Sequence, residues 1–194
     1  MAAVLFFSIC TILITWPLAA HLRTSVIGWP GDNWYYVWLI GWFQKAFFEL
    51  KQNPLLVPLF NSPTGWSLAY AEITFSNVVI ALPFSLMGGP VLGYNLVLLV
   101  SFVLSGFVVY RWIMSLTRST AAGLVGGALF AFGPYRMAHA YGHLPLMGTQ
   151  WLAVYFAGLY YLLQQRSVSW KYAGITGIGL GLAALSSLYY LFDV

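Results

Sequence analysis

The feature that most constrains the fold of this chain is a series of long apolar runs that carry almost no charge. A helix needs about 20 apolar residues to cross the hydrocarbon core of a bilayer, and its backbone polar groups must be paired within the segment. Of the 194 residues, 61% are hydrophobic and only 6% are charged, whereas about 25% of the residues of a soluble domain are charged. The sequence therefore predicts an all-α integral membrane protein.

Five of the runs have the length expected of transmembrane helices. They cover residues 2–20, 93–113, 120–138, 147–165 and 172–192. The first run follows Met1 directly and has no convincing cleavage site after it, so we expect a retained anchor rather than a signal peptide. Residues 21–92 then form a long external loop, and residues 1–194 form a single transmembrane domain.

The distribution of Lys and Arg predicts how these spans are oriented. Two short loops on one side of the membrane hold four basic residues, namely Arg111, Arg118, Arg166 and Lys171. The short loop on the other side, after Tyr135, holds Arg136 alone. Because basic residues are retained on the cytoplasmic side, we expect a multi-pass protein of the cell (inner) membrane with a cytoplasmic N-terminus.

The external loop contains two segments that we expect to lie in the plane of the membrane. Residues 33–52 are rich in Trp, Tyr and Phe and carry a narrow polar stripe, a pattern that favours the headgroup region. The alternative for this segment is an ordinary buried packing helix. Residues 73–88 contain Asn77 and Pro83 and are short for a span, so they predict a second in-plane helix. If they crossed instead, the N-terminus would face outward.

Acidic residues are so few that the position of each one is informative. Asp32 follows the first span and precedes the aromatic segment, and Glu72 occupies the equivalent place before residues 73–88. Either carboxyl group could cap a helix and satisfy backbone donors there. Either could instead act as a general base or metal ligand at the membrane surface, with Asp32 as the catalytic candidate and Glu72 as a second acid. The sequence leaves both explanations open.

The most polar short stretch lies on the same predicted side of the membrane. It contains Arg136, His139 and His143, and a guanidinium fork with neighbouring imidazoles can bind a phosphate group. The two histidines are four residues apart and could share a metal or a tetrapyrrole on one helical turn. Without a third ligand, however, solvated loop histidines are the more common case, and we predict no metal among these residues.

Several other patterns indicate packing rather than chemistry. Gly177 and Gly181, like Gly123 and Gly127, are four residues apart within apolar runs, a spacing that lets neighbouring helices approach closely. No Walker loop, nucleophile elbow or zinc-protease motif occurs in the sequence. The few charges are scattered singly, which argues against a nucleic-acid partner.

The order of these features resembles the N-terminal part of membrane glycosyltransferases of the C superfold (GT-C), the type that depends on polyprenyl-phosphate sugars. The matching pieces are Gly31-Asp32-Asn33 in the first external loop, Tyr110-Arg111-Trp112 near the end of a span, and a Gly/Ala-rich span that closes with Gly133-Pro134-Tyr135. Residues 142–151 are also similar to a group of uncharacterised bacterial multi-span proteins of this superfold. The resemblance covers most of the chain.

The resemblance implies transfer of a sugar from a polyprenyl-phosphate donor at the outer membrane face. Asp32 would take the proton of the acceptor or bind a divalent metal, and Arg136 would assist the departing lipid phosphate. Enzymes of this superfold are considerably longer, so we expect the chain to be the N-terminal part of a longer fold. The rival function is a non-catalytic accessory subunit of a photosynthetic or respiratory membrane complex, with contacts to lipid, other membrane subunits or pigments.

Overall fold

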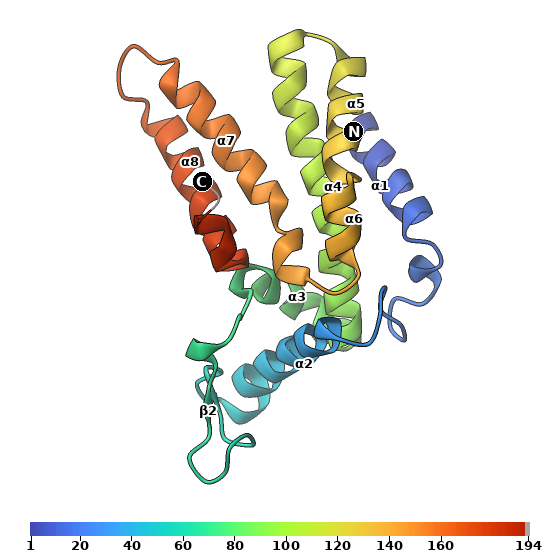
Figure 1. The fold of residues 1–194 in the computed structure, drawn as a ribbon, viewed down its shortest axis with the longest axis vertical. Helices are drawn as coiled ribbons and strands as arrows, with labels where there is room; N and C mark the ends of the chain where they lie inside the picture. The colour runs from blue at the N-terminus through green and yellow to red at the C-terminus, as the bar shows by residue number, and fades with distance from the viewer. Residues whose placement is uncertain (193–194) are drawn as a thin grey trace.

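The computed structural model describes residues 1–192 and consists almost entirely of helices (Figure 1). The α-helices are α1 (Ala2–Ile14), α2 (Asp32–Gln44), α3 (Phe75–Gly88), α4 (Pro90–Thr117), α5 (Thr120–Ala131), α6 (Pro134–Ala140), α7 (Thr149–Leu163) and α8 (Trp170–Ser186). Two-residue strands, β1 (Leu56–Val57) and β2 (Trp66–Ser67), pair antiparallel. The predicted all-α class is confirmed.

The 28-residue helix α4 is the centre of the structure and contacts α1, α2, α3, α5 and α7. It begins at Pro90, which favours the first helical position because it has no N–H group to leave unpaired. It ends where Arg118 turns into the left-handed conformation, and the side chain of Ser119 then caps α5 by accepting a hydrogen bond from the N–H of Ala122. These signals fold α4 and α5 into a tight antiparallel hairpin.

Two helical stretches, Pro90–Thr117 and Leu144–Leu163, are long and apolar enough to cross a membrane. The second of these joins α7 to the short 3-10 helix η4 (Leu144–Met147) that precedes it. The helices in the other predicted spans are shorter for local reasons. Helix α1 ends at Ile14, just before Pro17, because a residue that precedes proline avoids the helical conformation. Likewise, Gly133-Pro134 separates α5 from α6.

The bundle buries polar side chains and exposes apolar ones. Ser101, Ser105, Thr149 and Gln150 are buried between α4 and α7, while large apolar side chains on the outer faces of α1, α5 and α8, such as Leu5, Leu129 and Ile178, are exposed. Soluble monomers rarely expose contiguous apolar surface of this kind. Helices in a bilayer do so routinely, because lipid covers their outer faces and internal hydrogen bonds join their inner ones.

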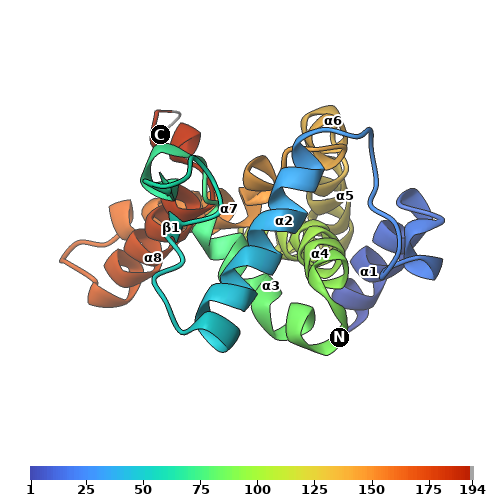
Figure 2. The same cartoon turned by 90° about the horizontal axis from the view of Figure 1, so that it is seen from below.

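The segment between α1 and α4 packs across one end of this bundle. Helix α2 runs crosswise to the long helices in Figure 1, and Figure 2 shows it lying over α3 and α4. Seven of its 13 residues are buried, including Leu39, Ile40 and Phe43. A single-turn π-helix, η2 (Lys45–Leu50), continues it. Helix α2 therefore buries one face against the bundle, and its first residues lie beside α6 (Figure 2).

Candidate functional site

The end of the bundle that α2 crosses collects most of the predicted site residues. Asp32 is the first residue of α2, and its Oδ2 lies 3.7 Å from Nε2 of His143 in the loop after α6. Both side chains are exposed, at 65% for Asp32 and 51% for His143. Residues more than a hundred positions apart thus meet because the crosswise direction of α2 brings its N-terminus to α6.

The structure shows that Asp32 does not cap α2. The N-cap of α2 is Gly31, and no side chain caps it. The local turn is held instead by Asn33, whose Oδ1 accepts hydrogen bonds from the N–H groups of Gly31 at 3.2 Å and Trp34 at 3.0 Å. The carboxyl group of Asp32 is therefore not the cap of α2, but it is the acid in the first turn of α2, where a negative charge is favourable, and it is exposed beside His143.

His139 and His143 also lie together. Their Nδ1 atoms are 3.3 Å apart, and the ring of Tyr135 packs edge-on against that of His139 at 4.4 Å between centroids. Partial burial, and second the neighbouring His143, lower the pKa of His139 from its ordinary value of 6.5. Asp32, His143 and His139 form a chain of titratable groups along the rim of the bundle, which we call the rim cluster.

The low pKa of His139 gives a testable titration. As the pH falls, His139 should become protonated at a lower pH than an ordinary histidine, because its charged form is disfavoured by burial and, second, by the neighbouring His143. In His143→Gln the pKa of His139 should rise only part of the way, since burial is the larger cause. The measurement is the pH dependence of the histidine ring signals by NMR. A midpoint above 6.5 for His139 would contradict this account.

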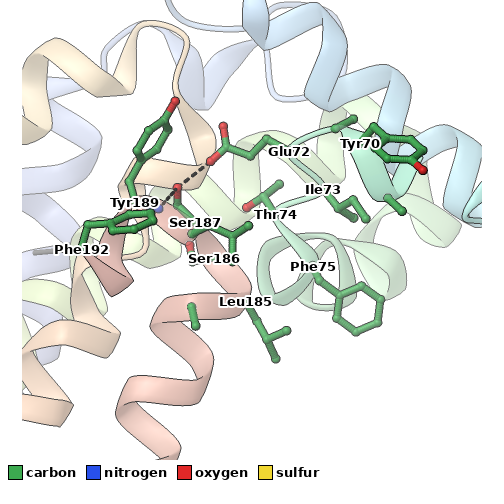
Figure 3. Close-up of a pocket in the computed structure, with 14 residues that line it drawn as sticks. Tyr70, Glu72, Ile73, Thr74, Phe75, Leu185, Ser186, Ser187, Tyr189 and Phe192 are labelled. Atoms are coloured by element: carbon green, nitrogen blue, oxygen red, sulfur yellow. Dashed lines mark hydrogen bonds between the residues drawn. The ribbon is translucent and has the colours of Figure 1, made fainter. Parts of the chain in front are cut away.

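Glu72 lies in a separate pocket at the same end of the bundle (Figure 3). Its Oε1 accepts a hydrogen bond from the hydroxyl of Ser187 at 2.5 Å, and its Oε2 accepts one from Tyr36 at 3.2 Å. It caps no helix, because α3 begins at Phe75 with Thr74 as its N-cap. The pocket has a volume of about 520 Å³ and lies between residues 69–75 and the end of α8.

Tyr36 connects the two acids. It is one helical turn after Asp32 on α2, and its hydroxyl donates to Glu72. Burial, followed by the negative charge of Glu72 and then that of Asp32, raises the pKa of Tyr36 above its ordinary value of 10.0. The raised pKa extends to higher pH the range in which this hydroxyl group is protonated and donates to Glu72.

Arg136 is in the interior and not in the rim cluster. Its side chain is 2% exposed, and Nε donates to the carbonyl of Ala131 at 3.0 Å while Nη1 donates to that of Met147 at 2.8 Å. Further hydrogen bonds reach Ser101 at 3.0 Å and Thr149. Ala131 and Met147 are the last residues of α5 and η4, and the negative ends of helix dipoles stabilise a cation. In this arrangement Arg136 joins helices, and its donors are largely occupied.

Sequence reasoning missed the two hydroxyl partners of Glu72. Ser187 lies within the last apolar run, and Tyr36 lies in an aromatic segment, so neither position carried a chemical pattern. Within residues 1–192, no group of three or more His, Cys, Asp or Glu side chains is placed to hold a metal ion.

Comparisons of the chain with protein-family models, curated proteins and solved structures found no match.

Proposed function

We propose that the protein is a membrane-embedded module of the GT-C type that transfers a sugar from a polyprenyl-phosphate donor at the outer membrane face. In this proposal α1, α4, α5, α7 and α8 cross the inner membrane with the N-terminus inside, and α2 and α3 lie along the outer surface. The exposed apolar faces of α1, α5 and α8 support the membrane location. The crosswise direction of α2 supports the in-plane placement (Figure 1).

The observation that carries the proposal is the exposed carboxyl group of Asp32 beside His143. A carboxylate at this position can accept the proton of an acceptor hydroxyl as that oxygen attacks the anomeric carbon. The bond from the anomeric carbon to the lipid phosphate breaks at the same time, and the phosphate leaves with the electron pair. The configuration at the anomeric carbon is inverted.

The rim histidines complete the proposed chemistry. The departing phosphate gains negative charge, and N–H donors placed near it lower the barrier. His139 and His143 are exposed enough to donate there, whereas the guanidinium of Arg136 is enclosed and already bonded to carbonyls. We therefore assign the phosphate role to the histidines and a structural role to Arg136.

Replacement of Asp32 by asparagine tests the proposal. The variant keeps the size of the side chain but cannot accept the proton, so turnover should fall by about 100-fold or more. Glu49→Gln is the matched control, since Glu49 is an exposed acid on η2 and should leave turnover unchanged. The assay is sugar transfer from a radiolabelled polyprenyl-phosphate sugar by the full-length protein in liposomes.

Two results would overturn the assignment. Unchanged turnover in Asp32→Asn would remove Asp32 from the mechanism. Absence of transfer by the unmodified protein, together with its stoichiometric copurification with a multi-subunit membrane complex, would favour the accessory-subunit function instead.

A further inference from the structure

We propose that the pocket around Glu72 binds an ammonium group carried by a small hydroxylated molecule. The pocket has a volume of about 520 Å³, within the range of small-molecule sites of about 300–1,000 Å³. The inference concerns binding alone and does not depend on sugar transfer.

The charge of the pocket selects the ligand class. Glu72 is the acidic group that lines it, and none of the lining residues described is Lys, Arg or His. Within residues 1–192, Glu72 forms no ion pair. Its two hydrogen bonds come from neutral hydroxyls, those of Tyr36 and Ser187. A carboxylate has about four acceptor positions, so positions are left for donors of a ligand. A phosphate or carboxylate ligand would meet an uncompensated negative charge.

The walls of the pocket fit a cation that also carries hydroxyl groups. Figure 3 shows Tyr189 and Phe192 on the α8 side of Glu72, and Tyr70 and Phe75 on the opposite side. Aromatic faces attract ammonium groups through the ring quadrupole. The hydroxyls of Thr74 and Ser186 also line the pocket, but they are buried and already accept hydrogen bonds from Asn77, so Glu72 is the main polar group offered to a ligand.

The carboxyl group is held in place rather than free to move. Ser187 and Tyr36 fix its two oxygens from different elements, the end of α8 and the middle of α2. The neighbouring Ser186 donates to the carbonyl of Pro145 at 2.8 Å and accepts from Asn77 at 3.1 Å, which ties α8 to α3 and η4. A fixed carboxylate in a partly enclosed pocket binds a charged donor more strongly than a mobile surface acid does.

An ammonium group on a small hydroxylated molecule has two simple sources, an amino sugar and free ethanolamine, and neither carries a phosphate group. The test is a titration of the full-length protein with glucosamine and with ethanolamine, monitored by saturation-transfer NMR. The protein should be in an uncharged polyoxyethylene ether detergent, which carries neither sugar nor amine. N-acetylglucosamine and N-acetylethanolamine are the matched neutral ligands.

We expect glucosamine or ethanolamine to bind at least tenfold more tightly than its N-acetyl form. The tighter of the two amines identifies the source, and Glu72→Gln should remove the preference while leaving the neutral ligands within about threefold, since the charge-assisted hydrogen bond is lost. Glu49→Gln should bind as the unmodified protein does.

The affinities of the amines and of their N-acetyl forms are compared on the unmodified protein. This test therefore remains valid even if Glu72→Gln fails to fold. Equal binding of the charged and neutral ligands would overturn the proposal. So would an unchanged amine preference in folded Glu72→Gln. Because no transfer is measured, a negative result here leaves the test of Asp32 unaffected.

Discussion

Arg136→Met is expected to lower the free energy of unfolding by about 3–5 kcal/mol. Methionine keeps much of the volume of arginine but donates no hydrogen bond. The carbonyls of Ala131 and Met147 would then lose their partner in the interior, and each unsatisfied buried carbonyl costs about 1–3 kcal/mol. The hydroxyls of Ser101 and Thr149 would lose theirs as well.

The free energy of unfolding can be measured by titration with SDS in mixed micelles, followed by tryptophan fluorescence. Arg166→Met is the matched control, because Arg166 is exposed in the loop between α7 and α8 and surface substitutions usually change stability by less than about 0.5 kcal/mol. Arg136→Lys keeps the positive charge but loses most of the guanidinium N–H donors. Its free energy of unfolding should lie between those of Arg136→Met and Arg166→Met. If Arg136→Met were as stable as Arg166→Met, the interior role of Arg136 would be wrong.

Gly127→Ala is expected to lower the free energy of unfolding by about 1–3 kcal/mol, the range for overpacking a close contact. A Cβ atom at Gly127 would lie 2.5 Å from the carbonyl oxygen of Gly106 on α4 and 2.7 Å from the ring of Phe7 on α1. The Gly106 contact involves backbone, so α4 and α5 would have to separate. This outweighs the gain of about 1 kcal/mol in helix propensity that alanine offers over glycine.

Gly177→Ala on α8 is the control for this prediction. A Cβ atom at Gly177 meets nothing within 4 Å, so the substitution should be neutral or stabilise the protein by up to about 1 kcal/mol. The same SDS titration compares the two variants. Equal effects of Gly127→Ala and Gly177→Ala would contradict the close approach of α4 and α5 at this position.

These two glycines show what the sequence could and could not predict. Gly123 and Gly127 have the same spacing as Gly177 and Gly181, and the sequence predicts close packing at both pairs. The first pair does pack against α4, with Gly123 facing the carbonyl of Tyr110, whereas Gly177 and Gly181 have open space beside them. On α8 the close contact is made by Gly179 against Tyr155. Spacing indicates a face that permits approach, but the neighbouring helix decides which glycine is approached.

In the site, too, the sequence predicted features that depend on neighbouring residues and not those that depend on residues distant in the chain. The apolar runs predicted the helices, because periodicity and length are local properties. They also predicted that Asp32 and the histidines would share one end of the bundle, and the structure places Asp32 beside His143. The roles of Arg136 and Glu72 depended on partners far along the chain, such as Met147 and Ser187. No local pattern encodes those partners.

The exposed position of Asp32 affects which substitutions the protein can tolerate during evolution. Its carboxyl group makes no capping hydrogen bond, fills no interior space and reaches into solvent, so its replacement should cost the scaffold no more than about 0.3–1 kcal/mol, the contribution of a first-turn acid. By contrast, a substitution at Arg136 would remove buried hydrogen bonds, and a larger side chain at Gly127 would separate α4 from α5. Substitutions at the rim cluster can therefore accumulate one at a time without unfolding the helices that position it.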